Sequence, residues 1–285
     1  MGVHDEHQRW AMTTPSDIRD EILRSVEGKH IVAAIIADDD GIVVETASAA
    51  DEARKLGLSL IHILDEGTPV QKGDEIVRFR GSPEQVVIAE DVLIGLMAKP
   101  SGIATAARKF VEKAGNRPKI VSGAWKKMPA SQKDAIRRAV VAGGAFYRMS
   151  RNPFVYLDKN YTKIFGGIKE SLEAVANLGD CKKVLQLKGR YYKDIVLEAR
   201  EAVQCGADIL YIDTGRPGDV SLVSEELIRL KMRSRVSVAF GGNVRLEDMD
   251  TLKALDIDIL DIGRQIVDAP LLDMRMEVID VEDRL

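Results

Sequence analysis

The chain has 285 residues, of which 45% are hydrophobic and 30% charged, so it can bury one large or two medium cores and is not a disordered protein. Its formal net charge of −4 gives no overall attraction to nucleic acid or to an anionic membrane, and neither is expected as a partner. The absence of about 18 consecutive apolar residues argues against a membrane-spanning helix.

The cellular compartment is predicted from the amino terminus and the cysteines. The first residues, MGVHDEHQRW, are polar and contain no apolar segment of the kind that a signal peptide requires. Cys181 and Cys205 have neither a CxxC spacing nor a zinc-site spacing, which favours ordinary thiols in a reducing compartment. We therefore expect a cytoplasmic protein.

The amino-terminal half is predicted to contain a flexible tail over 1–15 and an α/β domain over 16–116. Thr14 or Ser16 can cap a first helix that reaches Leu23. Further along, two β-branched runs flank an Asp-Asp-Asp-Gly turn, a pattern that predicts a hairpin. A short helix over 50–57, strands within 61–81 and a long helix over 83–115, interrupted near Pro100 and Gly102, complete this domain.

The chain changes character over 117–270, where apolar strands alternate with helices. The strand segments are short and apolar on both faces, as expected for parallel strands covered by helices. Six strands that alternate with five helices predict an incomplete parallel α/β barrel, and 271–285 is strand-like and predicted to return to the first domain. The strands are expected at 119–123, 154–158, 183–189, 208–213, 236–242 and 258–263, and the helices at 130–142, 162–178, 191–204, 222–232 and 246–254.

Ligands of such barrels bind at the carboxyl ends of the strands, and this rule selects a set of candidate residues. The set is rich in cations although the whole chain is acidic, which indicates a local site for an anionic ligand. Glycines after the last two strands, with backbone N–H groups just before helices, are suited to a phosphate. The candidates are Lys126, Lys127, Arg148, Arg151, Asp158, Lys159, Lys188, Arg190, Asp213, Arg216, Gly241, Gly242, Asn243, Gly263 and Arg264.

The order of these segments resembles the quinolinate phosphoribosyltransferases, from about Asp17 to the end of the chain. PSGIATAARKFVEKAG resembles a segment of the amino-terminal domain of that family, AGGAFYR its GG…HR segment and YLDKN its IKDN strand end. GADILYID resembles its strand ending in aspartate, AFGGN its SGGI, and DIGRQIVDAPLLDMRM its VGALTHSAPALDLSL terminus.

This resemblance implies an amino-terminal α/β domain combined with an incomplete α/β barrel. It also implies a homodimer, or a multimer of dimers, in which each amino-terminal domain covers the barrel mouth of its partner. Family members join the 5-phosphoribosyl group of phosphoribosyl pyrophosphate (PRPP) to the ring nitrogen of quinolinate. They release pyrophosphate and carbon dioxide and require Mg²⁺. In this chain the resemblance assigns the 5-phosphate to Gly241, Gly242, Gly263 and Arg264.

Several positions depart from the family pattern in the acceptor pocket. Asp91 stands at the position of an arginine that the partner subunit donates, and Trp125 stands where another arginine is expected. Tyr147 replaces a histidine, and Asp158 replaces a lysine. Lys126 and Arg148 match the family, and Val267 stands where a late histidine is expected.

The loss of cations predicts a changed acceptor. A carboxylate facing Asp91 or Asp158 would be repelled, at an expected cost on the order of one to several kcal/mol in a partly buried site. Trp125 and Tyr147 favour a flatter and less anionic aromatic heterocycle as substrate. We therefore predict substrate-binding roles for Asp91, Trp125, Lys126, Tyr147 and Arg148.

The acidic residues of the metal site have also changed. Lys188 occupies the position of a metal-associated glutamate, whereas Asp213 retains the second acid. Asp213, Lys188 and Asp158 are the predicted catalytic residues, and Asp213 is the predicted ligand of Mg²⁺. Because a lysine can replace part of the charge of the metal, the dependence on Mg²⁺ is predicted to be reduced.

Two other functions compete with this hypothesis. The chain could be a non-catalytic relative that binds a phosphorylated sugar or nucleotide through its glycines. It could instead use quinolinate itself, with cations supplied by Arg151, Lys163 or Arg190. Release of pyrophosphate distinguishes the first alternative from an enzyme, and binding of quinolinate distinguishes the second from an altered acceptor pocket.

Overall fold

The computed structural model describes residues 18–283, so the predicted tail and its caps, Thr14 and Ser16, lie outside the described residues. Contacts divide the chain into two units. Among the described residues, the first unit contains 18–40, 45–98 and 273–283, and the second contains 41–44 and 99–272. The sequence placed this division later, near 116, because it assigned the whole long helix to the first domain.

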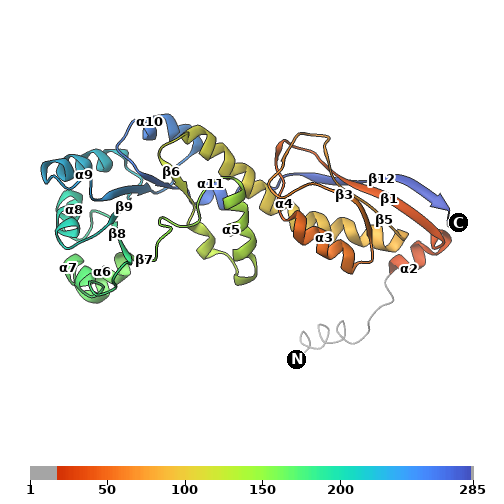
Figure 1. The fold of residues 1–285 in the computed structure, drawn as a ribbon, viewed down its shortest axis with the longest axis horizontal. Coiled ribbons are helices and arrows are strands. Elements are labelled where there is room, and N and C mark those ends of the chain that lie inside the picture. Colours follow the sequence, from red (N-terminus) through yellow and green to blue (C-terminus); the bar gives the residue numbers. More distant parts are fainter. Residues whose placement is uncertain (1–17, 284–285) are drawn as a thin grey trace, which may run out of the picture. The chain divides into compact units, whose positions relative to one another are not determined.

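The first unit is built on an antiparallel sheet with the strand order β12-β1-β5-β3 (Figure 1). The predicted hairpin across Asp38–Gly41 is wrong, since β1 pairs with β5 along one edge and with β12 along the other. Residues 31–37 of β1 are buried, which explains the uninterrupted apolar run. The strands are β1 Lys29–Ala37, β3 Ser59–Ile63, β5 Glu75–Gly81 and β12 Met274–Asp283.

The long helix α4, Pro83–Ala114, contributes residues to both units and continues through Pro100. The predicted interruption is therefore wrong. Gly102 serves a different purpose, because a Cβ atom there would lie 1.9 Å from the carbonyl oxygen of Pro270. The remaining short elements of this part of the chain are α2 Ile18–Ile22, η1 Arg24–Val26, β2 Gly41–Ile42, α3 Thr46–Lys55 and β4 Pro69–Val70.

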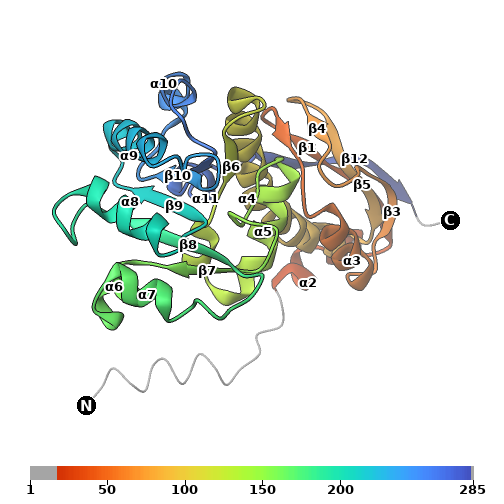
Figure 2. The same cartoon turned by 60° about the vertical axis from the view of Figure 1, so that its left-hand side comes forward.

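The second unit contains a six-stranded sheet with the order β6-β11-β10-β9-β8-β7, in which neighbouring strands are parallel (Figure 2). This confirms the predicted parallel α/β barrel, which stays open because β6 and β7 form opposite edges of the sheet. The strands are β6 Lys119–Val121, β7 Phe154–Leu157, β8 Lys182–Leu187, β9 Ile209–Asp213, β10 Ser237–Gly241 and β11 Ile259–Asp261.

Helices connect these strands and lie outside the sheet (Figure 2). The helix predicted over 162–178 is two helices, because Gly166 adopts φ = 89° and ends the first of them. The helical elements are η2 Ala124–Lys127, η3 Ala130–Gln132, α5 Lys133–Ala142, α6 Lys159–Phe165, α7 Ile168–Glu173, α8 Ile195–Gln204, α9 Pro217–Arg229, η4 Leu246–Asp248, α10 Met249–Lys253 and α11 Arg264–Val267.

Strand alternation separates two apolar clusters in this unit. One packs between the sheet and its helices, and the other, which includes Val184, Ile209 and Ala239, fills the interior of the barrel. Tyr211 belongs to the interior cluster, and Asp213 lies two residues further along the same strand. Residues two apart share a face, so Asp213 also faces the interior at its carboxyl end.

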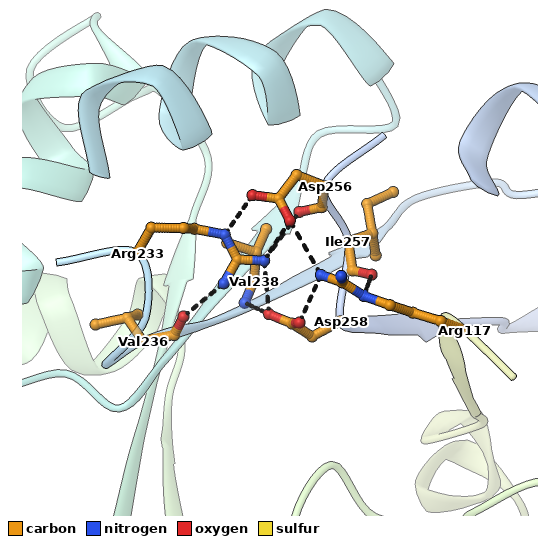
Figure 3. A network of polar contacts seen from close by, with 7 residues as sticks. All are labelled: Arg117, Arg233, Val236, Val238, Asp256, Ile257 and Asp258. Atoms are coloured by element: carbon orange, nitrogen blue, oxygen red, sulfur yellow. Dashed lines mark hydrogen bonds and ion pairs between the residues drawn. The ribbon is translucent and has the colours of Figure 1, made fainter. Parts of the chain in front are cut away.

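An ionic network connects the amino ends of three barrel strands, at the edge of the sheet opposite their carboxyl ends (Figure 3). Arg233 pairs with Asp256 and lies 3.0 Å from Asp258, while Arg117 lies 3.0 Å from Asp256 and 2.8 Å from Asp258. Asp258 also accepts a hydrogen bond from the backbone N–H of Val238. The hydrogen bond from Arg233 lowers the pKa of the Asp256 carboxyl. The network therefore joins the starts of β6, β10 and β11, away from their carboxyl ends.

Replacing Arg233 with methionine should lower the free energy of unfolding by about 2 kcal/mol at neutral pH, because two partly buried carboxylates lose a shared partner. The exposed Arg235 provides the control, since Arg235→Met removes the same charge outside the network. A depressed pKa stabilises the fold above the ordinary aspartate value of about 3.9 and loses that effect as pH falls. Urea unfolding at pH 7 and pH 3 should show the difference shrinking in acid, and equal stabilities of the two variants would contradict this role.

Candidate active site

A cavity of about 1300 Å³ lies at the carboxyl ends of the barrel strands. Its walls carry eight lysine or arginine residues and four aspartates. The chain as a whole has a net charge of −4, so this excess of cations is local. The charged lining residues are Lys126, Lys127, Arg137, Arg148, Lys159, Lys188, Arg245, Arg264, Asp158, Asp213, Asp261 and Asp268.

The opening beside β6 is bordered by the segment that carries Tyr147 and Arg148. Phe146 forms a parallel bridge with Val121, which places the next residues at the cavity. The indole N–H of Trp125 donates to the carbonyl of Tyr147 at 2.9 Å, and the two rings meet edge to face. The guanidinium of Arg137 lies 4.5 Å from the centre of the Trp125 ring system. Trp125 therefore helps to hold this segment in place.

Lys188 and Asp213 form an ion pair at the ends of β8 and β9. The Lys188 Nζ atom lies 2.6 Å from Asp213 Oδ2 and also donates to the Asp213 carbonyl at 2.6 Å. The Gln186 amide donates to the same carboxylate oxygen at 2.6 Å and accepts from the backbone N–H of Lys159. The pair is thus fixed by neighbouring strands, with both side chains only 22–24% exposed.

The buried carboxylate of Glu198, on α8, holds the loop that follows Lys188. Its oxygens accept hydrogen bonds from the backbone N–H groups of Lys188, Gly189 and Tyr191, at 3.1, 2.8 and 2.6 Å. Glu198 is only 2% exposed. Three backbone donors satisfy a buried carboxylate, so the loop conformation and the position of Lys188 are coupled to the core.

Asp261 and Tyr211 form a second polar pair that the sequence did not single out. The Tyr211 hydroxyl donates to Asp261 Oδ2 at 2.9 Å, and the backbone N–H of Gly123 donates to Oδ1 at 3.0 Å. Burial raises the pKa of the Tyr211 phenol and that of the Asp261 carboxyl. Tyr156 also lines the cavity, with the Lys126 ammonium 4.9 Å from its ring centre. The sequence could have indicated Tyr211 through strand alternation, because Tyr211 precedes Asp213 by two residues and so lies on the same face of its strand.

Glycines shape the ends of β9 and β10. Gly242 has φ = 108°, and a Cβ atom there would lie 2.6 Å from the backbone nitrogen of Gly215. Gly215 has φ = 68° and donates its N–H to the carbonyl of Gly241. Arg264 donates to the side chain of Asn243 at 3.3 Å, so the loops after β10 and β11 are linked. This arrangement leaves backbone N–H groups and a guanidinium beside the cavity.

The predicted site residues divide into two groups. Most of them line one cavity, whereas Gly241 lies behind it, where a Cβ atom would come within 2.4 Å of the Tyr211 hydroxyl. Asp91 is exposed on α4 in the first unit, and its predicted role depends on a second subunit. The alternative cations Arg151, Lys163 and Arg190 are not among the residues that line the cavity. Those that line it are Trp125, Lys126, Tyr147, Arg148, Asp158, Lys188, Asp213, Gly242, Gly263 and Arg264.

The side chains give a poor match to a divalent metal site. Mg²⁺ prefers several oxygen ligands, often including carboxylates. Asp213 has one carboxylate oxygen engaged by Lys188 and Gln186, and Asp158 accepts hydrogen bonds from two backbone N–H groups at the start of α6. Within residues 18–283, no group of three or more His, Cys, Asp or Glu side chains is arranged to hold a metal ion.

Fold and cavity together define an α/β-barrel protein with a site suited to an anionic, phosphorylated ligand. Comparison with known proteins makes the assignment specific. The model of the quinolinate phosphoribosyl transferase C-terminal domain matches residues 103–277, and that of the N-terminal domain matches 17–101. The chain belongs to the quinolinate phosphoribosyl transferase family.

Relatives of known name support this assignment. A probable nicotinate-nucleotide pyrophosphorylase (carboxylating) of Archaeoglobus fulgidus is 26% identical over 257 residues, covering 90% of this chain and 97% of the relative. The Homo sapiens nicotinate-nucleotide pyrophosphorylase (carboxylating) is 23% identical, covering 86% and 82%. The crystal structure of the Pyrococcus furiosus nicotinate-nucleotide pyrophosphorylase has the same fold, with a TM-score of 0.80, 19% identity and coverage of 99% and 78%.

No helix within residues 18–283 is both long enough and apolar enough to span a membrane.

Proposed function

We propose that this protein transfers the 5-phosphoribosyl group of PRPP to the ring nitrogen of an aromatic heterocycle and releases pyrophosphate. The observation that carries the proposal is the cationic cavity at the carboxyl ends of the strands, with the Lys188–Asp213 pair at its wall. Family membership supports the same reaction type. We propose a homodimer as the working form, as the resemblance implies, and the cytoplasm as its compartment, because both cysteines are free.

Different residues of the cavity are suited to the different charged groups of PRPP. Gly242, Gly263 and Arg264 are suited to the 5-phosphate, since backbone N–H groups and a guanidinium bind phosphate oxygens well. Lys188 supplies positive charge for the pyrophosphate that leaves. Asp213 presents a carboxylate where the ribosyl carbon gains positive charge as its bond to pyrophosphate breaks.

We further propose that dependence on Mg²⁺ is reduced in this protein. Lys188 already places a positive charge 2.6 Å from the carboxylate that would otherwise be a metal ligand. A fixed ammonium can neutralise part of the pyrophosphate charge in the same region of the cavity. No step of the proposed reaction therefore needs to be assigned to a metal ion.

Calorimetric titration of PRPP, with Mg²⁺ and with a chelator, tests both proposals. We expect PRPP to bind in both conditions, with dissociation constants that differ by less than about tenfold, or 1.4 kcal/mol. Pyrophosphate release is then followed after addition of heterocyclic acceptors. Absence of PRPP binding in either condition would contradict the proposed function. Binding and turnover that require Mg²⁺ would contradict only the proposal about the metal.

A further inference from the structure

Asp261 differs from Asp213 in forming no close ion pair, although the positive charge of Lys126 acts on it from a greater distance. Asp213 is paired with Lys188, Asp158 caps the start of α6, and Asp268 is exposed. Asp261 is half-buried and forms no ion pair with the described part of the chain. Its two hydrogen bonds come from neutral donors, the Gly123 N–H and the Tyr211 hydroxyl. A bound ligand that donates hydrogen bonds would complete the environment of this carboxylate.

The sheet register places Asp261 beside the reacting region. Asp213, Gly241 and Asp261 are aligned on the neighbouring strands β9, β10 and β11. Adjacent strands lie about 4.8 Å apart, so the Cα atoms of the two aspartates are separated by about 10 Å. That distance suits a ribosyl group near one carboxylate and a flat ring near the other. Gly241 has no side chain, and the Tyr211 phenol occupies the space beside it.

The same glycine explains how Tyr211 reaches its partner. Tyr211 lies on β9 and Asp261 on β11, so the phenol must pass over β10. It does so beside Gly241, where a Cβ atom would be 2.4 Å from the phenol oxygen. Asp261 is thus held by groups on β9 and on the Gly123 loop, and its geometry is fixed before a ligand binds. A carboxylate held in this way can discriminate between ligands.

A carboxylate has acceptor capacity for about four hydrogen bonds, and two are used here. The remaining capacity favours an N–H or amino group on the ligand. A ligand carboxylate at the same place would meet like charge in a partly buried site, because Lys126, the cation that acts on Asp261, forms no close ion pair with it. Quinolinate carries two carboxylates and no N–H group, so a quinolinate carboxylate that faces Asp261 would be repelled and could not donate a hydrogen bond to it.

We propose that Asp261, positioned by Tyr211, is a specificity determinant that selects a heterocycle with an N–H or amino group beside the reacting nitrogen, and rejects a carboxylate there. This inference rests on the proposed phosphoribosyl transfer and narrows the class of acceptor. Since the selected acceptor has no carboxylate next to its ring nitrogen, the transfer releases pyrophosphate without carbon dioxide.

The test compares two acceptors that differ at one position. In 2-aminonicotinate, an amino group replaces the 2-carboxylate of quinolinate, and the rest of the molecule is unchanged. We expect 2-aminonicotinate to bind at least about tenfold more tightly than quinolinate, because hydrogen bonds to charged groups are among the stronger ones. Calorimetry gives the two dissociation constants, and pyrophosphate release with PRPP gives kcat/KM for each compound.

Two variants connect the preference to Asp261. Asp261→Asn keeps the shape and removes the charge, and the preference should fall to about threefold or less or reverse, since the repulsion is gone. Tyr211→Phe removes the hydroxyl that orients Asp261 and should reduce the preference in part, which provides a second test if Asp261→Asn does not fold. Asp180→Asn, in an exposed loop outside the cavity, removes the same charge and should leave the preference unchanged. Thermal unfolding checks that each variant is folded.

Titration of PRPP on the same samples separates the two possible failures. If PRPP binds and quinolinate is preferred, or if Asp261→Asn leaves the ratio of the two acceptors unchanged, the inference about Asp261 is wrong while the proposed function stands. If PRPP binds and neither acceptor does, the inference is also wrong. If PRPP does not bind to the wild-type protein, the proposed function fails first.

Discussion

Replacing Lys188 with methionine should weaken PRPP binding about a hundredfold and slow pyrophosphate release by at least the same factor. The substitution removes a cation from the cavity and leaves the Asp213 carboxylate without its ion pair. Loss of a cation that pairs with the bound pyrophosphate has an expected cost of about 3 kcal/mol of binding free energy, which corresponds to about two orders of magnitude in affinity. Calorimetry with PRPP and a pyrophosphate assay measure the two effects.

Lys183 provides the matched control for this variant. It lies on the same strand, β8, but does not line the cavity. Lys183→Met removes the same charge from the chain, and it should leave PRPP affinity within about twofold because Lys183 lies outside the cavity. If Lys188→Met and Lys183→Met bind PRPP equally well, Lys188 has no part in binding the donor.

A double variant separates the two consequences of losing Lys188. If the ammonium only neutralises Asp213, then Lys188→Met combined with Asp213→Asn should recover most of the PRPP affinity. If the ammonium also attracts the pyrophosphate, as we propose, the double variant should remain at least about tenfold weaker than the wild type. Full recovery would restrict Lys188 to a structural role.

The sequence predicted the parallel barrel well because its strands are short apolar runs that alternate with helices. The hairpin and the helix interruption were wrong for a common reason. The partners of β1 are distant in the chain, with β12 some 240 residues further on, and no local turn signal reports them. Pro100 lowers helix propensity locally, but the packing of α4 keeps the helix continuous.

The sequence predicted the site residues that follow strands, together with Asp213 at the end of β9, but it missed Asp261 at the end of β11. Lys188 and Gly242 come just after β8 and β10, so the rule for barrel ligands selects them. Asp261 is the last residue of β11 and lies in an otherwise apolar run. Its importance depends on Tyr211, 50 residues away, and only the lateral alignment of the strands brings the two together.

A methyl group at Gly242 should strongly reduce phosphate binding, because it would displace the backbone of the neighbouring loop. Gly242 has φ = 108°, which alanine rarely adopts, and the new Cβ would lie 2.6 Å from the nitrogen of Gly215. A backbone atom cannot rotate away as a side chain can, so the loops after β9 and β10 must move apart. We expect Gly242→Ala to bind PRPP about a hundredfold more weakly and to lose about 2 kcal/mol of stability.

The control for this variant is a glycine that tolerates a side chain. Gly218 lies in the first turn of α9, outside the cavity, and a Cβ atom there has no neighbour within 4 Å. Gly218→Ala should keep the wild-type affinity for PRPP and gain a few tenths of a kcal/mol from helix propensity. Calorimetry and urea unfolding on both variants give the comparison. If Gly242→Ala retains wild-type affinity for PRPP, the loop after β10 does not bind the donor, and the phosphate must be held by Gly263 and Arg264 alone.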